Sequence, residues 1–125
     1  MSIANKYNKG KLFFTTRAPE NVQFTKLSDV AQHFKQDDIF MVQAMFINNK
    51  TKFGACPIVL CGNYYVSLPS HLTKVVREMI EDEELITAIN NGQFGFSFYT
   101  YQSPQGIFYS VNWIDIKQDT NFRLL

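Results

Sequence analysis

Side chains that commonly carry catalysis or bind metals are few in this chain, and they follow no known motif. The two histidines, His33 and His71, are far apart, and Cys56 and Cys61 do not form a C-x-x-C pair. A metal site needs His, Cys or carboxylate ligands at defined spacing. Nucleophile-elbow, phosphate-loop and dinucleotide-binding motifs are also missing from the sequence. We therefore expect no catalytic residue, no metal and no cofactor.

The positions of the carboxylates also argue against catalysis. Asp37 and Asp38 could pair as acids, but two acids between a helix and a strand are typical of a solvated turn. The acidic run at 81–84 is typical of the exposed start of a helix. Positions 39–77 and 85–114 contain no carboxylate, so the expected strands lack the usual ligands of a metal-dependent nuclease. We expect a binding protein rather than an enzyme.

Aromatic residues are abundant, with 12 Phe, 6 Tyr and 1 Trp. Single-stranded nucleic acids are held by rings that stack on bases and by cations that follow the phosphates. Tyrosine suits a half-exposed position, because its ring stacks while its hydroxyl stays in water. The alternative is that each ring belongs to the core. The candidate nucleic-acid-binding residues are Lys11, Arg17, Lys50, Lys52, Phe53, Tyr64, Tyr65, Tyr99, Tyr101, Tyr109 and Trp113.

The chain begins with polar residues, and the pattern in the rest of its first third predicts short strands, one helix and a long strand. The strand candidates are 11–16 and 22–24, on either side of a turn at Pro19. Thr25 or Ser28 can cap a helix that runs to about Phe34. Residues 39–47 are apolar on both faces of a strand, which is typical of a central strand.

The remainder alternates between strand and helix patterns. Residues 53–61 and 64–68 predict two strands, and Pro57 predicts a bulge or an edge in the first of them. A helix begins near Pro69 with Val75, Val76 and Met79 on its buried face, and it continues or restarts over 81–90. Along 94–101 and along 107–116, two sets of side chains alternate, and the turn at 103–106 joins the two segments. This pattern predicts a β-hairpin.

This order predicts a mainly β (α+β) chain. Strand-strand-strand-helix-strand-strand is the order of the oligonucleotide-binding (OB) fold, a five-stranded, partly open barrel, although other α+β arrangements share it. The 125 residues fit a single domain. We divide it into a helix-containing N-terminal extension (1–36), an OB-like core (37–116) and a tail (117–125).

Composition leaves the partner open. The formal net charge is +1, with 46% hydrophobic and 18% charged residues, so overall charge does not indicate nucleic acid. Cys56 and Cys61 would lie too far apart along one strand for a disulfide. No signal peptide precedes Lys6, and the longest apolar stretch is too short to cross a bilayer. We expect a cytoplasmic protein without membrane contact.

The segment NNKTKFGACPIV, at 48–59, resembles small single-stranded DNA-binding proteins of phages and mobile elements of Gram-positive bacteria. The similarity continues at VSLPSHL (66–72), Gly95-Phe96 and YSVNW (109–113), and it covers about residues 37–116. The resemblance implies an OB fold, homo-oligomers, no cofactor, and DNA replication or recombination with proteins of those pathways as partners. The chain departs from that family in its weak basicity and in lacking an acidic C-terminal tail.

Two binding hypotheses follow. The first is non-catalytic, largely sequence-independent binding of single-stranded DNA. The second is a protein-interaction module, such as a phage-type inhibitor or adaptor, that would use exposed Tyr and Trp as interface anchors. The position of the aromatic side chains distinguishes a contact surface from a core.

Overall fold

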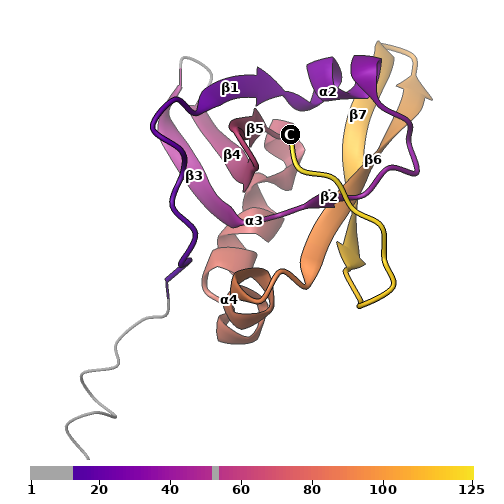
Figure 1. Ribbon diagram of the computed structural model, residues 1–125. Coiled ribbons are helices and arrows are strands. Elements are labelled where there is room, and N and C mark those ends of the chain that lie inside the picture. The colour runs from indigo at the N-terminus through magenta and orange to yellow at the C-terminus, as the bar shows by residue number, and fades with distance from the viewer. Residues whose placement is uncertain (1–12, 52–53) are drawn as a thin grey trace, which may run out of the picture.

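The computed structural model describes residues 13–51 and 54–125. Within these ranges the chain is mainly β, with two sheets facing each other and helices around them (Figure 1), which confirms the predicted class. The elements are β1 Gln23–Lys26, α2 Leu27–His33, β2 Phe40–Met41, β3 Ala44–Thr51, β4 Gly54–Cys61, β5 Tyr64–Ser67, the 3-10 turn η1 Ser70–Leu72, α3 Thr73–Ile80, α4 Glu83–Asn90, β6 Phe94–Ser103 and β7 Gly106–Asp115.

The strands form a four-stranded sheet in the order β1-β5-β4-β3 and a three-stranded sheet in the order β2-β6-β7. β1 runs parallel to β5, and the other pairs are antiparallel. In the part of the chain that the structure describes, β5 and β7 do not pair, so the strands form no closed barrel. β1 occupies the edge of β5 instead. The predicted terminal hairpin is confirmed, because β6 and β7 pair from Phe94 to Asp115.

The single strand predicted over 39–47 is wrong, because the chain crosses from one sheet to the other there. β2 belongs to the three-stranded sheet and β3 to the four-stranded sheet. The Val42 N–H donates to the Phe94 carbonyl (3.0 Å), and the next N–H, that of Gln43, donates to the Leu60 carbonyl (2.8 Å). Consecutive residues therefore bond to different sheets, and one bent segment joins the two.

Gly95 permits the close approach of β2 to β6. A Cβ atom at Gly95 would collide with the Phe40 carbonyl oxygen and lie 2.9 Å from Ile116 Cδ1. Alternation along β6 puts Gly95 on the face opposite Phe94, Phe96 and Phe98, yet Gly95 is buried as well. The missing side chain therefore serves the contact between strands rather than a binding surface.

The N-terminal segment differs from its prediction. Residues 13–16 form no strand, and 11 and 12 lie outside the described residues. The backbone of 13–16 bonds instead to the Asn90 side chain, whose Oδ1 accepts from the Thr15 N–H (2.9 Å) and whose Nδ2 donates to the Phe13 carbonyl (3.0 Å). The strand predicted near 22–24 occurs as β1, one residue later, and the following helix is α2.

The long helical region contains a break. η1 and α3 follow Pro69, and α4 restarts after Asp82. The Asp82 carboxylate accepts from the backbone N–H groups of Glu84 (3.0 Å) and Leu85 (3.2 Å). This is an N-cap, and it explains why the helix restarts there. No helix among residues 13–51 and 54–125 is long and apolar enough to cross a membrane.

The tail joins the two sheets on the side of β2. The Arg123 N–H donates to the Ile39 carbonyl (2.7 Å), and the Arg123 carbonyl accepts from the Met41 N–H (3.2 Å). Further on, the Leu125 carbonyl accepts from the Asn63 N–H (2.8 Å) in the β4–β5 turn. The tail therefore lies along β2, at the edge of the three-stranded sheet.

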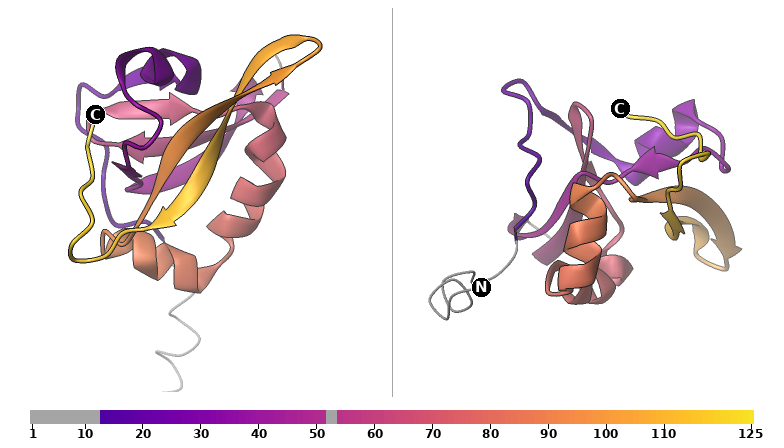
Figure 2. Two further views of the ribbon diagram at one scale, coloured as in Figure 1. Left: turned by 90° about the vertical axis from the view of Figure 1, so that its right-hand side faces the viewer. Right: turned by 60° about the horizontal axis from the view of Figure 1, so that its bottom comes forward.

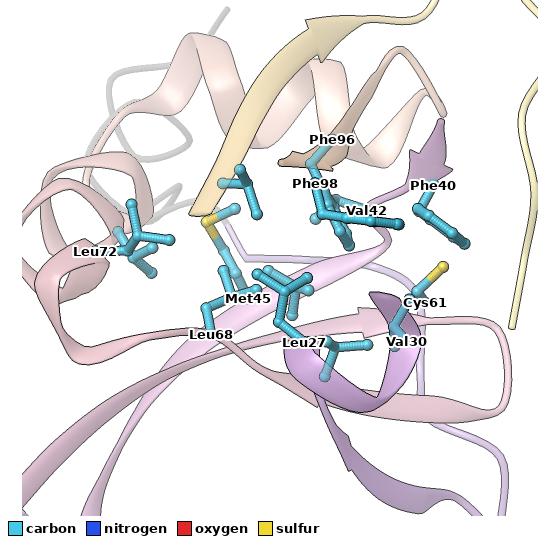
Figure 3. Packing of buried hydrophobic residues seen from close by; sticks show 14 of the residues in the cluster. Leu27, Val30, Phe40, Val42, Met45, Cys61, Leu68, Leu72, Phe96 and Phe98 are labelled. Atoms are coloured by element: carbon cyan, nitrogen blue, oxygen red, sulfur yellow. The ribbon is translucent and has the colours of Figure 1, made fainter. Parts of the chain in front are cut away.

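The core lies between the sheets, where side chains of β2 and β6 meet those of α2, β3 and β4 (Figure 3). Phe40 and Phe96 are fully buried and stack with ring centroids 5.5 Å apart. Val76 of α3 is fully buried as predicted, while Val75 and Met79 are half-buried against the same cluster. Pro57 is buried in β4, between β3 and β5, so its predicted edge position is wrong. The register shift between β3 and β4 falls between Asn48 and Thr51.

Candidate functional site

A groove of about 480 Å³ lies where the tip of the β6–β7 hairpin reaches the ends of β1 and β5 and the start of β4. In the left view of Figure 2 the hairpin tip and the end of β5 point to the same side of the molecule. The groove is lined by Lys26, Leu27, Ser28, Ala55, Cys56, Ser67, Leu68, Pro69, Ser70, His71, Ile107, Phe108 and Tyr109.

Strand pairing explains how distant parts of the chain meet here. Lys26 of β1 lies opposite Ser67 of β5 in the parallel pair, and residues directly opposite share a face of the sheet. The Leu68 N–H donates to the Pro57 carbonyl (2.9 Å), which holds the end of β5 beside β4. The open side between β5 and β7 leaves this end of the sheet accessible to the hairpin tip.

The groove carries cationic and polar groups but no acid. Lys26 and His71 line it, both are exposed, and no Asp or Glu is among its lining residues. The His71 Nε2 lies 3.1 Å from the Ser110 Oγ, and Ser110 is only 4% exposed. The Ser110 hydroxyl therefore orients the His71 ring at the wall of the groove. Such a site favours an anionic ligand with flat apolar parts.

The hairpin tip presents two of the predicted rings. Tyr101 and Phe108 lie opposite each other across β6 and β7 and stack with centroids 5.8 Å apart and planes 23° apart. They are 42% and 39% exposed. Tyr99 lies next to Tyr101, with ring centroids 6.2 Å apart. We call Tyr101 and Phe108 the hairpin platform.

Three other predicted rings turn toward the core. Trp113 stacks on Phe94 (centroids 5.6 Å apart) and packs edge-on against Phe96. Tyr109 also packs against the core cluster, although it lines the groove. Tyr64 packs against the core beside a second hollow, of about 600 Å³, between α2 and the tail. The register of β7 puts Tyr109 and Trp113 on the core side, and this removes Trp113 from the candidate interface.

Tyr65 lies on the outer face of the four-stranded sheet. Its ring is 5.1 Å from that of Phe24 on β1 and 5.2 Å from that of Phe46 on β3, between centroids. Phe24 is 64% exposed, and Lys26 follows two residues later on the same face. The rings of Phe46, Tyr65 and Phe24 therefore form a row across the sheet, two residues along β1 from the groove residue Lys26.

The structure describes only some of the predicted cationic side chains. Arg17 and Lys50 are exposed, and the Lys50 N–H donates to the Asn48 Oδ1 (3.0 Å). Lys11, Lys52 and Phe53 lie outside the described residues. The structure adds Lys26, which the sequence reasoning did not select.

The groups considered for catalysis have structural partners. Asp38 accepts from the Lys35 N–H (3.0 Å) and pairs with Arg123 (3.4 Å). That backbone bond, supported by the Arg123 charge, lowers the pKa of Asp38. Burial raises the pKa of the Cys61 thiol to about 11, so this thiol is protonated at neutral pH. Residues 13–51 and 54–125 contain no cluster of three or more His, Cys, Asp or Glu side chains that could hold a metal ion.

Four residues of this surface were missed: Phe24, Lys26, His71 as a groove residue, and Phe108. Counting back from the turn at 103–106 places Phe108 opposite Tyr101, so its position was available from the hairpin pattern. Phe24 and Lys26 depend on the parallel pairing of β1 with β5. That pairing is distant in sequence and leaves no local signal.

Comparison of the chain with protein-family models, with curated proteins and with solved structures gives no match. The function is therefore argued from the groove and its surroundings.

Proposed function

We propose that this chain is a non-catalytic, largely sequence-independent binder of single-stranded DNA that acts in replication or recombination of a phage or mobile element. The observation that carries the proposal is the groove. Lys26, His71 and Phe108 line it, Phe108 stacks on the exposed Tyr101 of the hairpin platform, and no carboxylate is among the lining residues. Rings that can stack and cations that can meet phosphates are the two requirements for holding a single strand.

The strand connectivity supports an OB-type arrangement. The bent segment of β2 and β3 corresponds to the first strand of that fold, because it pairs with β4 and with β6. β4 and β5 then correspond to the second and third strands, and β6 and β7 to the last two. OB folds bind oligonucleotides on the face of strands two and three and at the loop between strands four and five. The groove lies between the matching elements, β4, β5 and the β6–β7 tip.

The alternative is a protein-interaction module, and one observation favours it. Ile107, at the hairpin tip, is 66% exposed beside Phe108, and exposed apolar side chains of this kind anchor protein interfaces. Absence of DNA binding at low salt would favour this alternative. Homo-oligomers, and replication or recombination proteins as partners, remain part of the proposal.

Binding of oligo-dT at increasing salt tests the proposal through Lys26. With two to four phosphate contacts, the slope of log K against log salt should be about −1.4 to −2.8, at about −0.7 per contact for single strands. Lys26→Gln should make the slope less steep by about 0.7, because it removes one contact. Fluorescence anisotropy of an end-labelled oligonucleotide measures both values.

Lys117→Gln is the matched control, because Lys117 is exposed but follows the far end of β7 from the hairpin tip. Its slope should equal that of wild type. An unchanged slope for Lys26→Gln would contradict a phosphate contact in the groove, and absence of oligo-dT binding by wild type at low salt would contradict the proposed function.

A further inference from the structure

We propose that β1 provides a second stacking position for the single strand, at Phe24, and that Lys26 links it to the groove. This inference rests on the proposed function and adds binding residues from the N-terminal segment. It predicts that DNA leaving the groove continues over the outer face of the four-stranded sheet, toward β1 and β5.

The first argument is the exposure of Phe24. A phenyl ring in a paired strand usually covers a core, yet this one is 64% exposed. It contacts Tyr65 on the neighbouring strand, with ring centroids 5.1 Å apart and planes 39° apart. Tyr65 in turn meets the edge of Phe46. Phe24 is thus supported on one side and open to solvent on the other, as a platform for a base requires.

The second argument is continuity. Lys26 is two residues from Phe24, and strand side chains alternate, so both point to the same face of β1. Lys26 lines the groove. Two residues of an extended strand span about 6.6 Å, which is close to the length of one nucleotide step along a stretched single strand. One phosphate at Lys26 can therefore connect a base in the groove to a base on Phe24.

The third argument is charge. By register, the outer-face partners of Phe24 and Lys26 are Tyr65 and Ser67 on β5, followed by Leu60 and Ile58 on β4. None of these side chains is acidic. Leu60 and Ile58 are each 1% exposed, so β1 and β5 form the accessible part of this face. Among the described side chains of β1 and β5 on this face there is no carboxylate that would repel phosphates, and Lys26 supplies a positive charge.

Oligonucleotide length separates the two binding positions. Because Phe24 lies about one nucleotide step beyond Lys26, an oligo-dT of about two nucleotides can occupy the groove without reaching β1. One of about twelve nucleotides can reach both positions, within the range of 4–16 nucleotides bound by one OB fold. Phe24→Ala should weaken binding of the longer strand by about 5- to 150-fold, the value of one stacked base. It should change binding of the shorter strand by less than about twofold.

Two further variants of Phe24 and one control variant distinguish loss of stacking from a structural effect. Phe24→Leu keeps apolar bulk next to Tyr65 but lacks a ring face, so it should lose affinity like Phe24→Ala. Phe24→Trp keeps a ring and should restore binding of the longer strand. Phe122→Ala removes a ring that is 45% exposed on the tail, away from this surface, and should bind both strands like wild type.

The outcomes are distinct. If Phe24→Leu binds the longer strand like wild type while Phe108→Ala binds it weakly, DNA binding stands and the second position on β1 is wrong. Equal losses for the short and long strands in Phe24→Leu would also overturn it, because they would indicate a change in the groove itself. If wild type binds neither strand at low salt, the proposed function fails and this inference fails with it.

Discussion

Replacing Val76 by aspartate should abolish the cooperative unfolding transition. Val76 lies on α3, is fully buried and belongs to the cluster between the sheets. The substitution loses about 1.5–3 kcal/mol of apolar burial and leaves an unpaired buried charge, which costs about 3–5 kcal/mol more. A domain of this size is stable by only about 5–15 kcal/mol. Trp113 is half-buried and packs against the core, so its fluorescence during urea unfolding reports the change.

Lys74→Asp is the matched control for Val76→Asp. Lys74 lies on the same helix but is exposed, and an acid in the first turn of a helix is favourable. This variant should unfold cooperatively, close to wild type. A Val76→Asp protein that melts like wild type would show that α3 does not bury this face against the sheets.

Loss of the hairpin platform should have the largest effect on DNA binding. Tyr101→Ala and Phe108→Ala should each weaken binding of oligo-dT by about 1–3 kcal/mol, the value of one base–aromatic stack. The double variant should lose less than the sum, because the two rings stack on each other and can share one base. Fluorescence anisotropy at fixed low salt measures these losses.

Both side chains are partly exposed, so unfolding of the platform variants by urea should remain close to wild type. Phe122→Ala again serves as the control, since its exposure, 45%, matches that of Tyr101 and Phe108. If both platform variants bind like wild type, the contact surface does not include the hairpin tip. If they lose binding only together with stability, the rings are structural.

Local patterns predicted the elements whose signals are contained in a few residues. The hairpin follows from alternation on both sides of the turn at 103–106. For 81–90 the pattern predicted a helix that continues or restarts, and the structure shows a restart after the capping carboxylate of Asp82. The break at Val42 and Gln43 was not predictable in this way. Both faces of 39–47 are apolar because the segment serves two sheets in succession, and the same pattern suits one buried strand.

Long-range contacts determined the remainder. Phe13 and Thr15 bond to Asn90, 75 or more residues away. Within the described part of the strand expected over 11–16, this contact takes the place of strand pairing. The pairing of Arg123 with β2 converts the tail into part of the scaffold. Local propensity contains no information about such partners.

Residue type selected the candidate rings, but it did not determine which side of the hairpin each ring faces. Tyr99 and Tyr101 lie on the outer face of the hairpin, as alternation in β6 indicates. Trp113 was selected for its ring although alternation in β7 groups it with Val111. In the structure Val111 belongs to the core, and Trp113 is half-buried against it. Lys26, which lines the groove, comes from a strand whose partner is 41 residues away in sequence.

The measurement that tests the central claim most directly is binding of wild-type protein to a single strand and to the duplex of the same length and sequence. We expect about micromolar or tighter affinity for the single strand, at least about tenfold tighter than for the duplex, because Tyr101 and Phe108 can stack only on bases that are already unstacked. Few cations flank the groove, so phosphates alone give a duplex little to bind. Equal affinity for both at low salt, or no binding to either, would contradict the account.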